Sequence, residues 1–461
     1  MNSIHVIGLG VTETPELSQK ALQALENADR VIGSARQLKV VETLLQQQQT
    51  LELPPLSELA LYLESALSQE SNRGHTVILA SGDPLYYGIG RWLSRHIPPE
   101  QLFFYPAVSS IQAACHALGL SLQDVEVISL HGRPMERIRT VLKHRHTLVV
   151  LTDKYSTPQV LARECVAAGF EQSKLVVCES MGYENQRLSH FDASELAQSV
   201  QLFDPLHITV IETRGDGGVL PEFPGIPDDH FETGTEPGKG MITKREVRLN
   251  ILSLLQPSND DVIWDIGAGC GSVAIELAYW NECCQVIAIE QHTERLKHLE
   301  KNRRRFGVVS NLSVQPGRAP EILEGLSHPN KVFIGGSDGR LPELLAQTWE
   351  MLPPGGVLVA SAVTENTRHQ FMTFLTQRNL AADAKPETCQ IAVSKGGFLS
   401  DQLIYRPVLP VTLFRFIKRL ANSPDKQSTA QLPDETSIDG QERYEEISDV
   451  FVAGRDRAGR G

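Results

Sequence analysis

The feature that most constrains the fold is the segment DVIWDIGAGCG at residues 261–271. Its first half is almost continuously apolar and includes β-branched residues, which is typical of a parallel strand covered on both faces. Three glycines follow at alternate positions, Gly267, Gly269 and Gly271, and the apolar segment SVAIELAYW begins directly after them. Glycine lets the backbone turn sharply and approach a ligand closely. We therefore predict a buried strand, a ligand-binding turn and a helix.

The spacing of these glycines indicates which ligand the turn binds. A dinucleotide-binding turn has the pattern G-x-G-x-x-G, whose third glycine would fall where this chain has Ser272. Asp265 precedes the turn by two residues, and its carboxylate would repel a pyrophosphate but attract an ammonium or a sulfonium. Glu290 ends the next apolar strand, QVIAIE, and can accept hydrogen bonds from two ribose hydroxyls. Together these residues favour a turn that binds S-adenosylmethionine (SAM), a cationic nucleoside without phosphates. The alternative is a turn whose glycines serve only the packing of the strand and the helix.

The composition of the whole chain narrows the classes of partner. With 461 residues the chain is long enough for two or three domains, and its net charge of -13 argues against general affinity for nucleic acid. No apolar run approaches the length of a membrane span, so we expect a cytoplasmic protein without membrane contacts. The seven cysteines include no C-x-x-C pair, and the histidines are scattered. We expect reduced core thiols and no metal site.

The N-terminal half contains three turns at which a ligand could bind. The first strand, SIHVIG, ends at Gly8 and is followed by Gly10; we place the next helix from Thr14, as its N-cap, onward. A second strand, TVILA, leads into the turn Ser81 to Pro84 at the sheet edge where α/β proteins bind ligands. Ser109 or Ser110 caps a helix that ends at Gly119.

Basic residues offer partners for an acidic substrate. Arg133 ends the strand segment VEVISLHGR and is better placed than Arg137 and Arg139 in the following segment, which we predict to be a basic helix. The pattern T-x-x-E at Thr243 predicts a capping box and a helix through residue 255. Lys244 and Arg248 lie four residues apart on that helix and therefore share one face, where they either form a positive rim or are simply solvated.

The domain boundaries follow from composition. Residues 211–240 are rich in glycine and proline and lack apolar periodicity, which indicates an interdomain connection. We predict a first α/β domain over residues 1–213, a linker over 214–240 and a second domain over 241–418, in which strands alternate with helices around a parallel sheet closed by a hairpin. The polar segment 419–461 is predicted to be a disordered tail.

Both halves contain motifs of known families. The segments SGDPLYYGIG, PAVSSIQAACHALGL and LHGR resemble the tetrapyrrole (corrin/porphyrin) methylase family, in particular its branch that methylates precorrins at C5. The segments ITKREVR, DIGAGCGSVAIELA, GRAPE and FIGGS resemble the Rossmann-like precorrin C15-methyltransferases that also decarboxylate. The two motif sets in this order resemble the fused family of cobalamin biosynthesis, over about residues 1–418.

The resemblance implies a fold and a function for each half. It implies a tetrapyrrole methylase domain of two α/β subdomains, then a class I Rossmann-like methyltransferase domain, each binding one SAM. The substrate would be a precorrin-6Y-type tetrapyrrole, methylated at C5 and C15 and decarboxylated at the C12 acetate, and the enzyme would be a homo-oligomer. The implied SAM-binding residues are Gly8, Gly10, Gly82, Asp83, Ser109, Ser110, Thr243, Gly267, Gly269, Gly271, Glu290 and Ala319. To these we add Asp265 because of its charge and its position before the glycine turn.

For the substrate carboxylates we predict Lys244, Arg245 and Arg248 in the second domain and Arg133 in the first. Three positions depart from the family pattern: Val11 and Thr12 replace the usual proline and glycine, and Arg318 stands where an acidic residue often faces adenine. No residue is singled out as a general acid or base. The alternatives left open are a methyltransferase of another substrate class such as RNA, a NAD-dependent dehydrogenase disfavoured by the glycine spacing, and a non-catalytic SAM-binding regulator.

Overall fold

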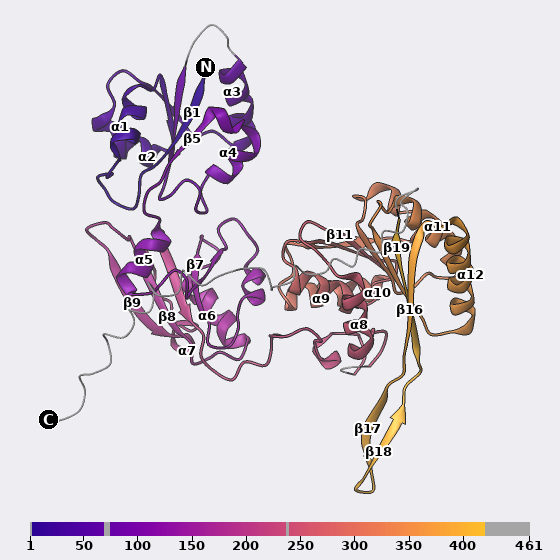
Figure 1. Ribbon diagram of the computed structural model, residues 1–461. Helices are drawn as coiled ribbons and strands as arrows, with labels where there is room; N and C mark the ends of the chain where they lie inside the picture. Colours follow the sequence, from indigo (N-terminus) through magenta and orange to yellow (C-terminus); the bar gives the residue numbers. More distant parts are fainter. Residues whose placement is uncertain (1, 69–73, 237–238, 420–461) are drawn as a thin grey trace, which may run out of the picture.

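The computed structural model describes residues 2–68, 74–236 and 239–419, which form three α/β bodies (Figure 1). The predicted tail lies outside the described residues from residue 420 onward. The predicted α/β class is confirmed, since each body is built on its own sheet of five or seven strands, and a separate two-stranded ladder extends the third. The first two bodies together form the first domain and the third forms the second domain.

The first body is an all-parallel sheet in the order β3-β2-β4-β1-β5. Its central strands are apolar and buried on both faces, as a parallel sheet between helices requires. In chain order its elements are β1 (Ser3–Gly8), α1 (Gln19–Glu26), β2 (Arg30–Gly33), α2 (Ala35–Val41), η1 (Glu42–Leu44), β3 (Gln49–Glu52), α3 (Leu56–Ser68), β4 (His75–Ala80), α4 (Gly90–His96), η2 (Pro99–Gln101) and β5 (Leu102–Tyr105).

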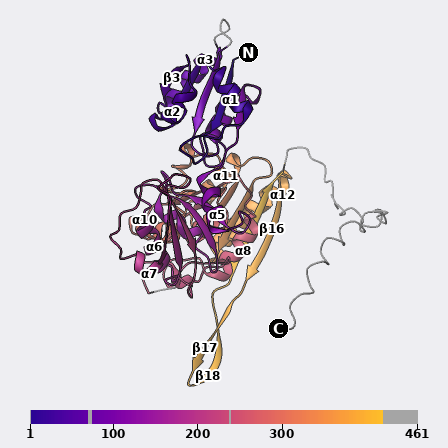
Figure 2. The same ribbon diagram turned by 90° about the vertical axis from the view of Figure 1, so that its left-hand side faces the viewer.

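The second body has a mixed sheet in the order β6-β7-β10-β8-β9, in which only β6 and β7 are parallel. Figure 2 shows it directly below the first body. Its elements are α5 (Ser110–Leu118), β6 (Glu126–Ser129), η3 (Met135–Thr140), β7 (Thr147–Leu151), α6 (Pro158–Ala167), β8 (Lys174–Glu179), β9 (Arg187–Asp192), α7 (Ala193–Leu196) and β10 (His207–Glu212). Two subdomains within the first domain are thus confirmed.

The third body is a seven-stranded sheet in the order β13-β12-β11-β14-β15-β19-β16. The strand predicted at residues 261–266 is the third strand in this order, with Ile263 and Trp264 in the two apolar cores on opposite faces. Its elements are η4 (Asp228–His230), α8 (Arg245–Leu255), β11 (Val262–Ile266), α9 (Ser272–Trp280), β12 (Gln285–Glu290), α10 (Thr293–Arg305), β13 (Leu312–Pro316), η5 (Leu323–Gly325), β14 (Lys331–Ile334), α11 (Leu341–Met351), β15 (Val357–Ala362), α12 (Glu365–Ala381), β16 (Ala384–Ile391), β17 (Ser394–Leu399), β18 (Gln402–Pro407) and β19 (Val411–Lys418).

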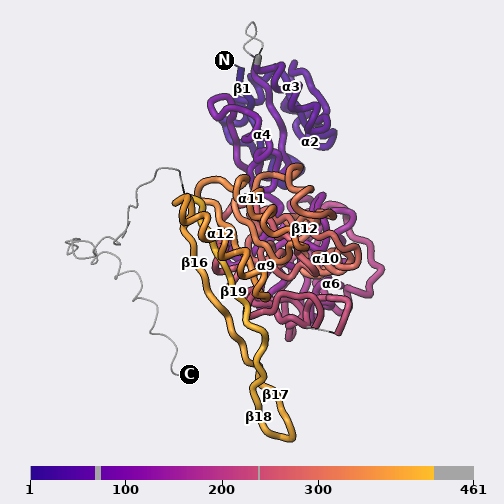
Figure 3. Tube along the Cα trace, turned by 90° about the vertical axis from the view of Figure 1, so that its right-hand side faces the viewer, coloured from indigo at the N-terminus to yellow at the C-terminus, as the bar shows by residue number. Residues whose placement is uncertain are grey.

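The predicted closing hairpin is present and longer than expected. Strand β19 pairs antiparallel with both β15 and β16, so the parallel sheet ends in antiparallel strands. Between them, β17 and β18 form a separate two-stranded ladder that projects beyond the body as an arm (Figures 1 and 3). The arm connects to β19 through Val408 and Leu409, which matter for the site described below.

Three local predictions are wrong. Helix α1 begins after Ser18, whose hydroxyl accepts from the Ala21 amide, and not after Thr14. The predicted basic helix is only the short 3-10 helix η3, and its arginines have partners on different sides of the segment, as described below. At α8 the N-cap is Lys244, so the capping box does not form; Glu246 instead forms an ion pair with Lys395 at 3.2 Å.

The predicted linker is divided between the two domains. Leu220 belongs to the core of the second body, and the Glu222 carboxylate accepts from the His144 amide at 2.7 Å. Only three residues later the Gly225 amide donates to Glu276 of the second domain at 2.7 Å, and Ile226 and Phe231 lie in that domain's core. The chain therefore crosses between the domains within residues 223 and 224, so residues 225–232 are part of the second domain.

Candidate active sites

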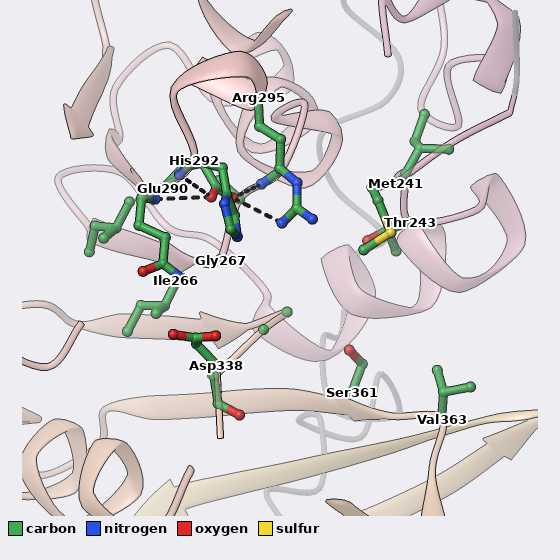
Figure 4. A pocket seen from close by; sticks show the side chains of 18 of the residues that line it. Met241, Thr243, Ile266, Gly267, Glu290, His292, Arg295, Asp338, Ser361 and Val363 are labelled. Carbon is green, nitrogen blue, oxygen red and sulfur yellow. Dashed lines mark hydrogen bonds and ion pairs between the residues drawn. The ribbon is translucent and has the colours of Figure 1, made fainter. Parts of the chain in front are cut away.

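The second domain has a cavity of about 570 Å³ at the carboxyl ends of its parallel strands. Parallel α/β sheets bind ligands at this edge because the loops after neighbouring strands converge there. Figure 4 shows Glu290, His292 and Arg295 on one side of the cavity, Met241 and Thr243 across from them, and Ser361 on the sheet below. Loops after β11, β12, β13, β14 and β15 all contribute to the wall.

The glycine turn after β11 forms part of this wall. Gly267 and Gly269 line the cavity with φ of 75° and 61°, a region that favours glycine. A Cβ on Gly267 would lie 2.7 Å from the Gly336 amide nitrogen. Gly271 does not line the cavity; a Cβ there would lie 2.3 Å from Leu299, so this glycine lets α9 pack against α10. Its prediction as a ligand contact is corrected to a packing role.

Glu290 is held at the end of β12 by backbone hydrogen bonds. One carboxylate oxygen accepts from the Gly269 amide at 2.9 Å and the other from the Gln291 and His292 amides, both at 2.9 Å. The Arg295 guanidinium lies 3.9 Å away. These contacts fix the carboxylate in the cavity wall with acceptor capacity remaining, as the recognition of a ribose diol requires.

Asp265 lies beneath the cavity and not in its wall. It is 1% exposed and accepts from the Ala274 amide at 3.0 Å, while its Oδ1 atom has no hydrogen-bond partner within the described part of the chain. Burial, together with the nearby negative charge of Glu290, raises the pKa of its carboxyl to about 7. Asp265 is therefore not part of the cavity wall, and its predicted direct contact with the cofactor is not supported by this geometry.

The arginines and lysine of this region have different roles. Lys244 and Arg318 line the cavity together with Ala319, and Arg318 forms an ion pair with Asp338 at 2.7 Å across two loops of the wall. Thr243 also lines it, as predicted. Arg245 is exposed and lies outside the cavity lining, so its placement at the substrate is not supported by this geometry.

Arg248 is completely buried, and its prediction as part of a positive rim is wrong. Its side chain is 0% exposed and forms ion pairs with Glu276 at 2.5 Å and Asp228 at 3.1 Å. It also donates to the Thr243 and Ile226 carbonyls and lies 4.9 Å from the centre of the Phe231 ring. The pattern of α8 suggested a shared exposed face because it did not show that residues 225–231 cover that face.

Part of the cavity mouth is apolar, which sequence reasoning missed. Met241, Val363, Val408 and Leu409 line the cavity while remaining 66%, 50%, 39% and 74% exposed. They come from three segments far apart in the chain, the connection before α8, the end of β15 and the base of the arm. Exposed apolar side chains gathered at one opening mark a surface for an apolar ligand.

The first domain has a larger cleft, of about 1140 Å³, between its two subdomains. Gly10, Gly82, Ser109 and Ser110 line it as predicted, and the Gly82 amide donates to the Gly10 carbonyl at 3.1 Å. Ser109 caps α5 together with Gln112 in a capping box, and the helix ends at Gly119 as expected.

Two residues predicted to contact the cofactor here support the loops instead. Gly8 does not line the cleft; a Cβ there would lie 2.6 Å from the Gly82 carbonyl. Asp83 accepts from the Leu85, Tyr86 and Ala107 amides and so fixes the turn after β4 without lining the cleft. Both positions are corrected from ligand contacts to structural ones.

The first cleft is strongly basic. Its lining contains one acidic side chain, Asp153, among the described residues, and Asp153 accepts from the Gly132, Tyr155 and Ser156 amides. Burial and the neighbouring Arg137 lower the pKa of Arg133. Leu85, Tyr86, Tyr87 and Tyr155 add exposed apolar surface. The basic side chains in the lining are Arg36, Arg91, Arg133, Arg137 and Lys154. Two of them were predicted from the sequence as candidates for the substrate carboxylates, Arg133 first and Arg137 second.

Two further observations concern the described residues as a whole. No helix among them is long and apolar enough to span a membrane. No three histidine, cysteine, aspartate or glutamate side chains among them are grouped so that they could hold a metal ion.

Comparison with known proteins agrees with this two-site arrangement. Residues 3–197 match the model of the tetrapyrrole (corrin/porphyrin) methylases, and residues 237–418 match the precorrin methyltransferase domain. A precorrin-6Y C(5,15)-methyltransferase [decarboxylating] from Sinorhizobium sp is 34% identical over 418 residues, covering 90% of this chain and 96% of that protein. The chain belongs to this family.

Two shorter relatives each match less than half of this chain. A probable cobalt-precorrin-6B C(15)-methyltransferase (decarboxylating) from Pyrobaculum aerophilum is 33% identical over 190 residues, 41% of this chain and 93% of that protein. A cobalt-precorrin-7 C(5)-methyltransferase from Salmonella typhimurium is 32% identical over 185 residues, 40% of this chain and 88% of that protein. The predicted family resemblance is thus confirmed for the chain as a whole.

Proposed function

We propose that this chain is a bifunctional SAM-dependent methyltransferase of cobalamin biosynthesis. It methylates C5 and C15 of precorrin-6Y, or of its cobalt form, and decarboxylates the C12 acetate. The observation that carries the proposal is the presence of two separate cavities in one chain, each with glycines at the carboxyl end of a parallel strand. The relative that aligns with 90% of this chain has a name that gives both positions of methylation.

The first domain is assigned to C5 and the second to C15 and decarboxylation. Support comes from the match of residues 3–197 to the tetrapyrrole methylases and of residues 237–418 to the precorrin methyltransferase domain. The names of the two shorter relatives divide the same activities between separate proteins, with decarboxylation assigned to the C15 enzyme.

The second cavity has a polar inner part that fits SAM. The glycine turn admits the ligand close to the backbone, Glu290 can accept from the ribose hydroxyls, and Ala319 is available beside the adenine. Asp265 lies buried below the turn with a carboxyl whose pKa is raised to about 7, so a cation bound above the turn would favour its ionised form. SAM supplies the methyl group as part of a sulfonium. We expect two SAM molecules per chain, one in each domain.

The outer part of the second cavity fits a flat macrocycle fringed with carboxylates. Met241, Val363 and Leu409 offer apolar surface to the ring, while Lys244 and Arg295 can meet its carboxylates. Because reduced tetrapyrrole carbons have enamine character, the protein mainly has to align the acceptor carbon with the methyl group and exclude water. Loss of carbon dioxide from the C12 acetate leaves an electron pair conjugated toward C15, which links the two reactions of this domain.

The first cleft would hold the same substrate through its arginines. Arg133 and Arg137 lie on the side opposite the loops with Gly10 and Gly82, so the carboxylates can be bound away from the donor. The tyrosines of the loop after β4 provide a flat apolar surface for the macrocycle.

The decisive experiment is mass spectrometry of the product formed from precorrin-6Y and excess SAM by the full chain. We expect two added methyl groups and the loss of one carbon dioxide. Calorimetric titration with SAM should find two binding sites per chain. A single donor site would contradict the tandem arrangement, and SAM binding without turnover of any corrin would indicate a regulator.

A further inference from the structure

The 3-10 helix η3 belongs to two sites at once. Arg137, in its middle, lines the cleft of the first domain. Arg139, two residues later, does not line that cleft and instead lies at the contact with the second domain. In Figure 1 helices α9 and α10 are the parts of the second domain that face this side of the first domain.

The second domain holds η3 through several direct contacts. Arg139 donates to the Arg304 carbonyl at the end of α10 at 2.8 Å, while two further hydrogen bonds tie it to Glu164 in its own domain. The Tyr279 hydroxyl of α9 lies 3.1 Å from the Arg139 carbonyl and 3.0 Å from the Pro221 carbonyl. Both carbonyls belong to the first domain, so a hydrogen bond from this hydroxyl to either of them crosses the interface.

The loops that follow α9 and α10 also pack closely against η3. A Cβ on Gly307, after α10, would lie 2.3 Å from the Glu136 carbonyl, so glycine is needed for this close contact. Glu282, just after α9, accepts from the Thr140 hydroxyl at 3.2 Å and lies 3.8 Å from the Arg137 guanidinium. The contacts therefore reach from the interface to a side chain of the first cleft.

We propose that the second domain is a structural part of the first active site: Tyr279 and Gly307 hold η3 so that Arg137 is positioned for a carboxylate of the tetrapyrrole. Short 3-10 segments have weak internal hydrogen bonds and depend on their surroundings. The two-residue crossing between the domains keeps this docking in place. Tyr279 is thus a positioning residue for C5 methylation. The proposal rests on the function proposed above.

The test is the full-chain variant Tyr279→Phe, which keeps the ring in the core and removes only the hydroxyl. We expect the KM for the tetrapyrrole in C5 methylation to rise about threefold, as the loss of one hydrogen bond predicts. The KM for SAM, C15 methylation and loss of carbon dioxide should stay unchanged. The matched control is Tyr405→Phe on the exposed arm, which should change neither reaction.

A second variant, Gly307→Val, places a side chain against Glu136 and should raise the same KM more strongly. Unchanged C5 kinetics in Tyr279→Phe would overturn the proposal, and so would equal losses of both methylations in that variant. If instead the unaltered chain fails to make the doubly methylated product, the proposed function itself has failed, which is a different result.

Discussion

The two clefts of this chain, which we propose bind the same kind of ligand, have differently built walls. The first lies between two sheets, and its five basic side chains come from loops and helices of both subdomains. The second lies at the edge of one sheet, and each of its three basic side chains has a carboxylate partner: Arg295 has Glu290, Arg318 has Asp338 and Lys244 has Asp228. Its mouth is formed in part by aliphatic side chains, whereas exposed tyrosines predominate in the first.

The difference shows how the position of a cavity in the fold limits which side chains can contact a substrate. A cleft with two facing walls can surround a polycarboxylate with cations on several sides. A cavity on one edge has fewer positions for them and depends more on apolar contact with the macrocycle. The comparison predicts that charge substitutions affect the first site more and that changes in shape affect the second more.

The largest expected effect concerns an arginine that takes no part in either wall. Arg248→Ala leaves Glu276 buried without its cation, which should lower the free energy of unfolding of the second domain by roughly 3–5 kcal/mol. Urea unfolding of the full chain measures this effect. The exposed Arg245→Ala, three positions earlier, is the matched control and should change stability little. If Arg248→Ala raised only the KM for the tetrapyrrole, our correction of its role would be wrong.

The shape of the second cavity is tested by Gly269→Leu. The side chain would enter the donor part of the wall, so C15 methylation and decarboxylation should fall about 100-fold, the cost of a misplaced reacting group. C5 methylation should persist, and mass spectrometry of the products separates the two. The control is Gly355→Leu, which has a similar positive φ of 81° and open space around it. Equal loss of both methylations in Gly269→Leu would show that the sites are not independent.

Asp265 provides a test by pH that distinguishes the second site from the first. Its pKa of about 7 in the folded chain lies above the ordinary value of 3.8, so the folded state retains a proton that the unfolded chain loses between these values. Stability of the SAM-free protein should therefore fall as pH rises from 4 to 7. Asp265→Asn should remove this fall, so between pH 5 and pH 8 the free energy of unfolding of the variant should gain about 3 kcal/mol relative to that of the wild type. Parallel curves for variant and wild type over this range would contradict the raised pKa.

The smallest effect is expected from a single charge in the first cleft. Arg133→Ala should raise the KM for the tetrapyrrole in C5 methylation about tenfold, because one charge-assisted contact is lost. C15 methylation should be unaffected. Arg95→Ala on the exposed face of α4 serves as the control. A rise in the KM for SAM instead would place Arg133 beside the donor, not the substrate.

Sequence reasoning worked where a site is made by consecutive residues. The strand, glycine turn and helix from residue 261 to 280 are specified by local pattern and spacing, and the structure shows each of them. The same is true of Ser109 and Gly119 at the ends of α5. In these segments helical or strand propensity, turn chemistry and burial all favour the same conformation.

Sequence reasoning failed where the role of a residue depends on which distant segment packs against it. Arg248 and Lys244 share the spacing of a solvated helix face. Asp228, in the segment upstream of α8, lies near both, yet Arg248 is completely buried whereas Lys244 stays partly exposed and lines the cavity. Arg137 and Arg139 both look like candidates for the substrate, and only the docked second domain separates their roles. The apolar mouth was missed because Met241, Val363 and Leu409 meet only in three dimensions.

The crossing at Phe223 and Pro224 decides where this enzyme can be divided. A cut at residue 241 would remove Ile226 and Phe231 from an apolar core and deprive Arg248 of Asp228. A cut within the crossing leaves both cores whole, and the exposed Phe223 tolerates a new terminus. Two such halves, mixed in solution, would have to reassociate through the surface around η3. The affinity between them would measure how much of the association of the two domains comes from direct contact and how much from the covalent link.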